Sequence, residues 1–113
     1  MNMKAYSVIL LLAGLHALPL SAQSEETLVQ KGKAVYLSWC SPCHAGGPNH
    51  PGTAALETKY EGKIPAVLEE RTGLTPEFVR FYVRNGISIM PFFRKVEISD
   101  ADLDAIGAYL SRP

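Results

Sequence analysis

Residues 40–44 read Cys-Ser-Pro-Cys-His, and they contain both cysteines of a chain of 113 residues. Two cysteines separated by two residues are typical of a thiol redox pair, a zinc site or a covalently attached haem. A redox pair of the thioredoxin type needs a βαβ setting, and no strand pattern surrounds this motif. Zinc needs a fourth ligand, for which only His50 is available downstream. A disulfide within the motif would close a very small loop and stabilise little.

The complete motif favours haem, because a histidine follows the second cysteine directly. Cys40 and Cys43 can each add to one vinyl group of a porphyrin, and His44 is then held beneath the iron as its proximal ligand. We therefore expect one haem c, bound covalently through the two cysteines. A zinc site and a dithiol remain the alternatives.

The iron then needs a sixth ligand or an open position. Met90 is the candidate ligand, because its thioether suits an iron that holds two oxidation states, and Pro91 fixes the backbone beside it. The alternative is a methionine that fills a gap in the core. His50 lies only six residues after His44, so we interpret it as a surface residue of the loop.

A second group of residues is expected around the haem. The carbonyl of Pro48 or Pro51 could accept the other ring N–H of His44, which would orient the imidazole and raise its basicity. Of the two we expect Pro51 to do so. Two aromatic side chains are expected to line the haem, and two other residues are candidates for binding one of its carboxylates: Trp39, Phe78, Tyr60 and Arg71.

Residues 1–22 have the pattern of a cleavable export signal. Lys4 provides the positive start, residues 8–18 are largely apolar, and a proline and small residues follow. The apolar run is shorter than the roughly 20 residues that span a bilayer. We expect export to the periplasm, with no membrane span after cleavage. An uncleaved membrane anchor is the alternative. The remainder, residues 23–113, is long enough for one domain.

Three helices can be placed from capping residues and apolar spacing. The first is expected over residues 25–37, capped by Ser24. The second begins at Thr75-Pro76-Glu77 and ends at Asn85-Gly86. The third begins with the capping pair Ser99 and Asp102. Residues 45–53 and 87–96 are expected to be loops.

The first and last of these helices are expected to cross closely. Gly32 lets the two backbones approach, and aromatic side chains cover the gap. The residues that we expect at this crossing are Gly32, Tyr36, Ile106 and Tyr109.

Over residues 23–113 the sequence resembles a class I cytochrome c, in its glycine–aromatic first helix, C-S-P-C-H motif, Pro-Gly loop, methionine loop and closing I-x-x-Y-L helix. The resemblance implies an all-α fold with three to five short helices wrapped around one covalently attached haem. Residues 78–93 (F-V-R-F-Y-V-R-N-G-I-S-I-M-P-F-F) more narrowly resemble the small cytochrome subunits of flavocytochromes that oxidise 4-alkylphenols, such as those of the p-cresol methylhydroxylase and eugenol hydroxylase type.

An iron with both axial positions filled has outer-sphere electron transfer as its remaining task, so we expect a non-catalytic subunit of an oxidoreductase complex. The resemblance implies that a flavoprotein dehydrogenase of the FAD type supplies the electrons. Another cytochrome, a cupredoxin or an oxidase would take them. A freely diffusing soluble periplasmic carrier is the alternative, and a haem enzyme or sensor with an open iron is a third hypothesis.

Charge and apolar composition bear on the partner. The 11 basic and 11 acidic residues balance, which excludes binding of nucleic acid through bulk positive charge. The apolar residues around Met90 favour a long-lived protein partner if they are exposed. Phe92 and Phe93 could equally pack on the haem.

Overall fold

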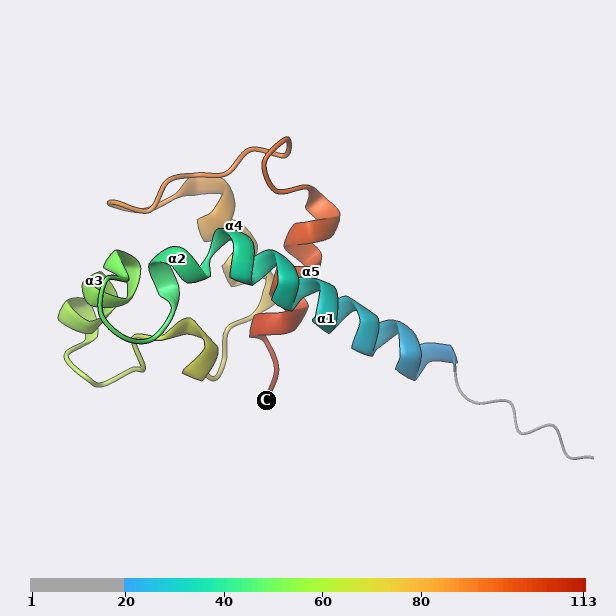
Figure 1. Cartoon of the computed structure of the whole chain (residues 1–113), viewed down its shortest axis with the longest axis horizontal. Coiled ribbons are helices and arrows are strands. Elements are labelled where there is room, and N and C mark those ends of the chain that lie inside the picture. Colours follow the sequence, from blue (N-terminus) through green and yellow to red (C-terminus); the bar gives the residue numbers. More distant parts are fainter. Residues whose placement is uncertain (1–19) are drawn as a thin grey trace, which may run out of the picture.

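The computed structural model describes the backbone of residues 20–113 and the side chains of residues 27–113. Helices are the only regular elements in this part of the chain, which confirms the expected all-α fold (Figure 1). The expected export signal lies, apart from residues 20–22, outside the described residues. The elements are α1 (Leu20–Trp39), α2 (Ser41–His44), α3 (Pro51–Tyr60), the 3₁₀ turn η1 (Leu68–Glu70), α4 (Pro76–Asn85) and α5 (Asp100–Leu110).

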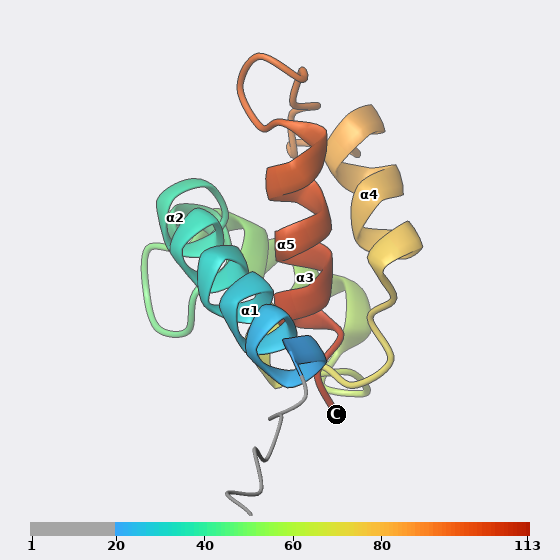
Figure 2. The same ribbon diagram turned by 90° about the vertical axis from the view of Figure 1, so that its right-hand side faces the viewer.

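Helix α5 is the centre of the fold, with α1 crossing it on one side and α4 packed on the other (Figure 2). At the crossing, the rings of Tyr36 in α1 and Tyr109 in α5 are 5.5 Å apart between centroids. Tyr36 and Ile106 are fully buried. The expected close crossing of the first and last helices is thus confirmed.

The ends of α4 and α5 follow from their capping residues. Thr75 Oγ1 accepts a hydrogen bond from the N–H of Phe78, and Pro76 occupies the first helical position. Ser99 Oγ accepts from the N–H of Asp102 at 3.1 Å. These starts are confirmed, and Gly86 ends α4 with a φ of 67°.

Helix α1 begins at Leu20 rather than after Ser24, and it continues to Trp39. No proline or glycine interrupts residues 20–26, so the backbone can remain helical through Ser24 instead of being capped there.

Helix α3 begins in residues 51–53, which the sequence predicted to be part of a loop. It continues through residues 54–60, for which the sequence predicted no helix or strand. Pro51 supplies a favourable first helical residue. The hydroxyl of Thr53 donates to the carbonyl of Ala45 at 2.8 Å, which ties α3 to the chain leaving α2. The helix has little amphipathic pattern, so periodicity could not reveal it. Helix α3 forms one wall of the cavity next to the Cys-Ser-Pro-Cys-His motif.

Candidate haem site

The Cys-Ser-Pro-Cys-His motif forms a single helical turn at the end of α1. The amides of Cys43 and His44 both donate to the carbonyl of Cys40, at 3.1 and 2.9 Å. Residues three and four apart on a helix lie on one face. The turn therefore places Cys40 and His44 on the same side, with Cys43 immediately before the histidine.

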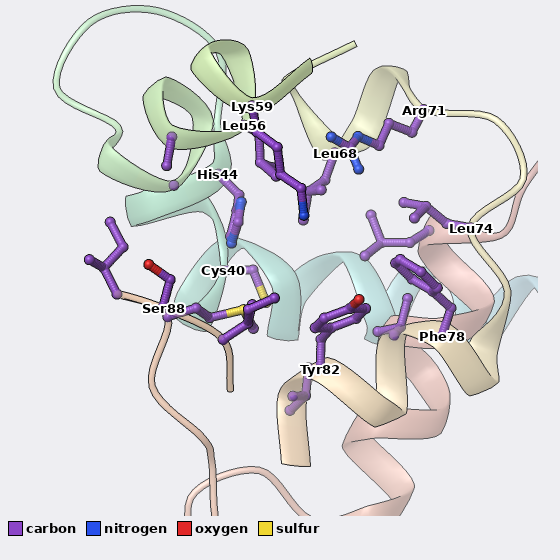
Figure 3. Close-up of a pocket in the computed structure, with 18 of the residues that line it drawn as sticks. Cys40, His44, Leu56, Lys59, Leu68, Arg71, Leu74, Phe78, Tyr82 and Ser88 are labelled. Carbon is purple, nitrogen blue, oxygen red and sulfur yellow. The ribbon is translucent and has the colours of Figure 1, made fainter. Parts of the chain in front are cut away.

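This turn borders a cavity of about 340 Å³ between α2, α3, α4 and the segment after α4 (Figure 3). The wall is mostly apolar, and an apolar wall excludes water from a porphyrin and its iron. The apolar residues lining it include Leu56, Leu68, Leu74, Phe78, Val79, Val83, Ile87, Ile89, Ile106 and Leu110.

His44 points its ring into this cavity (Figure 3). Burial, and secondarily the positive charge of Arg71, lower the pKa of His44. The imidazole is therefore neutral near pH 7 and keeps a lone pair, which is the state that binds a metal. Its Nδ1 is buried without a hydrogen-bond partner.

The two cysteines form no disulfide with each other, and they differ in environment. Cys40 lines the cavity, and burial raises its thiol pKa to about 12. Cys43 is exposed and lies outside the lining. Within the described residues no three potential ligands of the His, Cys, Asp or Glu type come together, so the alternative zinc site is not formed. His50 instead places Nδ1 3.0 Å from the carbonyl oxygen of Pro42.

Met90 also lines the cavity, from the segment that we call the methionine loop (residues 86–93). Its backbone is held in a tight turn. Ile87 N–H donates to Met90 O at 3.0 Å, and Met90 N–H donates to Ile87 O at 2.9 Å. Ser88, inside the turn, has a φ of +53°. The structure thus brings Met90 to the same cavity as Cys40 and His44. Met90 follows His44 by 46 residues in the sequence.

The expected hydrogen bond from His44 to the carbonyl of Pro51 is absent. Pro51 is the first residue of α3, and a carbonyl at that position points along the helix toward the amide four residues on. Its neighbour Gly52 is the residue that contacts the imidazole. A Cβ there would lie 2.8 Å from His44 Cε1 and 2.9 Å from Nδ1. Sequence reasoning placed Gly52 in a loop and missed this contact.

Two cations lie at one end of the cavity. Arg71 is only 8% exposed, donates from Nε to Pro65 O at 2.7 Å, and has an Nη2 with no partner. Its guanidinium lies 4.8 Å from the centre of the Tyr60 ring, and Lys59 Nζ lies 5.4 Å from the same centre. A buried cation that forms no ion pair with another described residue needs an anion. The carboxylates of a haem would supply it, so the residues present fit this cofactor. No motif or spacing in the sequence had indicated Lys59 as a residue of the site.

Of the two aromatic residues that we expected to line the haem, Phe78 and Trp39, only one lines the cavity. Phe78 lines the cavity, as expected. Trp39 does not, because its ring packs edge-on against Phe93 at 5.9 Å. Phe92 is 62% exposed and also outside the lining. Neither Phe92 nor Phe93 therefore belongs to the cavity wall.

Comparison with known proteins identifies the family. Residues 27–110 match the family model described as cytochrome C oxidase, cbb3-type, subunit III. The chain belongs to this family of cytochromes c. Cytochrome c6 of Bryopsis maxima is 32% identical over 79 residues, which cover 70% of this chain and 84% of that protein. No solved structure matches the chain significantly.

This cytochrome carries haem c, bound covalently through its cysteine pair, and it transfers electrons. The bound haem supplies a reversible one-electron couple at its iron. Among the described helices, none combines the length and the apolar character needed to cross a membrane.

Proposed function

We propose that this cytochrome is the electron-accepting subunit of a periplasmic flavoprotein dehydrogenase that oxidises 4-alkylphenols. His44 and Met90 would hold the haem iron, and the protein takes single electrons from the reduced flavin. The observation that carries the electron-transfer role is that both side chains line one apolar cavity beside Cys40. With two protein ligands the iron has no position left for substrate or dioxygen.

Replacing Met90 by leucine tests the ligand assignment. Leucine keeps the volume and removes the sulfur, so the weak sulfur-to-iron absorption band at the red end of the visible spectrum should disappear. The ferrous variant should then bind carbon monoxide readily, whereas the native protein should bind it only slowly, because Met90 must first leave the iron. A native protein that binds carbon monoxide as readily as the variant would favour the open-iron hypothesis.

Exposed aromatic side chains outside the cavity wall suggest a protein partner. Phe81 and Phe92 are 60% and 62% exposed, and neither lines the cavity. Phe81 lies on α4, and Phe92 lies in the methionine loop two residues after Met90. Exposed aromatic side chains beside a redox centre suit a lasting protein interface. The resemblance of residues 78–93 to flavocytochrome subunits supports a flavoprotein as that partner.

Co-expression with the neighbouring genes tests the complex. We expect the cytochrome to elute with a flavoprotein in gel filtration, and a Phe81→Ser, Phe92→Ser double variant to elute as a monomer. Ile64→Ser is the matched control, because Ile64 is also exposed (41%) but follows α3. Elution of the native protein as a monomer in every context would contradict the proposal.

A freely diffusing periplasmic carrier is the second candidate. Lys59 forms no ion pair with another described residue, and it lies at the cavity. An exposed cation beside the haem cavity favours transient, charge-steered encounters with an acidic partner. Reversible binding that weakens steeply with salt would support the carrier, whereas an apolar interface would be nearly insensitive to salt.

Export through residues 1–22 is part of the proposal. Sequencing the N-terminus of protein from the periplasmic fraction should give Gln23 as the first residue. A chain that retains Met1 would support the membrane-anchor alternative.

A further inference from the structure

Arg84, in the last turn of α4, links three segments that surround the methionine loop. Its side chain is 19% exposed. Nη1 donates to the carbonyl of Phe93 at 3.0 Å, and Nη2 donates to the carbonyl of Ile98 at 2.9 Å. Nη2 also lies 2.9 Å from Asp100 Oδ1. One guanidinium thus joins the end of the loop, the chain that follows and the start of α5.

Phe93 is the downstream anchor of the loop. Its N–H donates to the carbonyl of Val83 at 2.8 Å, and its carbonyl accepts from Arg84. Its ring packs edge-on against Trp39 of α1. Of these contacts, the bond from Arg84 is made by a charged donor, and such bonds are stronger than neutral ones.

Gly86 is the upstream anchor. A Cβ at this position would lie 2.7 Å from the carbonyl oxygen of Met90 and 2.9 Å from the amide nitrogen of Phe92. The loop therefore folds back tightly onto the end of α4. Met90 lies between Gly86 and Phe93 in the chain, and its own carbonyl takes part in the upstream contact, so the position of its sulfur depends on both ends remaining closed.

We propose that Arg84 is the positioning residue that keeps the methionine loop closed, so that Met90 stays in the cavity wall. Loss of the guanidinium leaves the carbonyls of Phe93 and Ile98 without their donor, and the downstream end of the loop opens more often. The inference rests on the proposed ligation by Met90 for its effect at the iron, but loop closure itself can be measured without reference to the iron.

Arg80 provides a matched control on the same helix, one turn earlier. It pairs with the carboxylates of Asp100, at 3.5 Å, and Asp104. Among the described residues it donates to neither Phe93 nor Ile98. Arg80→Met therefore removes a charge and a pairing with Asp100 while leaving the loop carbonyls bonded.

The experiment uses the mature haem-bearing protein as wild type, Arg84→Met, Arg84→Lys and Arg80→Met. Hydrogen exchange of the Phe93 amide reports opening of the loop, because this amide is bonded to Val83. We expect Arg84→Met to accelerate this exchange about tenfold, which corresponds to about 1.4 kcal/mol, the worth of one hydrogen bond to a charged group. Arg84→Lys keeps the positive charge but lacks the two separate NH₂ groups that reach the two carbonyls, so it should give a smaller increase.

Carbon monoxide binding to the ferrous protein provides the second measurement, since it requires Met90 to leave the iron. We expect a parallel, roughly tenfold faster association for Arg84→Met. Arg80→Met should remain near the wild-type value in both measurements. Equal acceleration by Arg80→Met and Arg84→Met, or none by Arg84→Met, would overturn the inference. If Arg84→Met does not fold, wild-type exchange in Arg84→Lys would overturn it instead.

The two proposals fail in different ways. Absence of the sulfur-to-iron band in the wild type refutes ligation by Met90, whereas the exchange of the Phe93 amide still decides whether Arg84 closes the loop.

Discussion

Gly32 of α1 lies directly against the backbone of Ala105 in α5. A Cβ added to Gly32 would be 2.6 Å from the carbonyl carbon of Ala105 and 2.8 Å from the Cβ of Tyr109. Neither atom is at the end of a flexible side chain, so neither can move aside without shifting α5. The two helices can approach this closely only because residue 32 has no side chain.

Substitution of Gly32 by alanine should therefore destabilise the protein by about 1–3 kcal/mol through overpacking. Intrinsic helix propensity alone favours alanine by about 1 kcal/mol, so a net loss isolates the clash. Thermal and denaturant unfolding of the haem-bearing protein measure the change. Gly46→Ala is the control, since its nearest neighbour would be Val67 Cγ2 at 3.5 Å. Wild-type stability in Gly32→Ala would contradict the close approach.

Substitution of Gly52 by alanine should disturb the cofactor more than the fold. The new methyl group would press on His44 and on the carbonyl of Cys43, at 2.7 Å. We expect a shifted midpoint potential and less haem attached per chain, measured by redox titration and intact mass. Gly46→Ala again serves as the control, because Gly46 lies in the connection from α2 to α3 and a Cβ there would meet only Val67, at 3.5 Å. An unchanged potential together with full attachment would show that α3 does not restrain the imidazole.

Asp100 should make the protein more stable above about pH 4 than at pH 2. Hydrogen bonds from Lys95, and then from Arg84, lower the pKa of Asp100 to about 2 from its ordinary 3.8. A depressed carboxylate pKa contributes stability above the unfolded-state pKa, and this contribution is lost as the pH falls through the folded-state pKa. Asp100→Asn should thus unfold more easily at pH 6, and its difference from wild type should shrink toward pH 2.

Denaturant titrations between pH 2 and pH 6 measure this difference. Asp104→Asn is the matched control, because Asp104 lies one turn further along α5 and pairs only with Arg80 among the described residues. A difference between Asp100→Asn and wild type that does not change with pH would refute the ion-pair interpretation.

The hydroxyl of Tyr109 should stabilise the contact between α5 and η1. Tyr109 is 2% exposed, and its hydroxyl donates to the carboxylate of Glu69. Burial, and then this hydrogen bond, raise the pKa of Tyr109. Tyr109→Phe should lower the free energy of unfolding by about 1–2 kcal/mol.

A double-mutant cycle of Tyr109→Phe with Glu69→Gln isolates the pairwise part of this effect. The corresponding cycle with Glu70→Gln is the control, because Glu70 is the neighbouring residue of η1 and makes no such bond. Equal coupling energies in the two cycles would contradict the assignment.

Local rules in the sequence determined the parts of the fold that depend on near neighbours in the chain. The caps at Thr75 and Ser99 act on amides three residues away, so the starts of α4 and α5 could be predicted. The turn at residues 40–44 is equally local, and its residue types and spacing specify haem attachment without reference to the rest of the chain. The crossing of α1 and α5 was predictable because a glycine and aromatic residues recur at helical spacing.

Only the tertiary structure decided which side chains from distant segments meet at the cavity. Lys59 and Arg71 share the ring of Tyr60, and Gly52 rather than the carbonyl of Pro51 contacts His44. Phe93 packs on Trp39, whereas Phe92 remains exposed. These outcomes depend on the path of the loops and on the packing of α3, which follow from many weak contacts that leave no periodic pattern in the sequence.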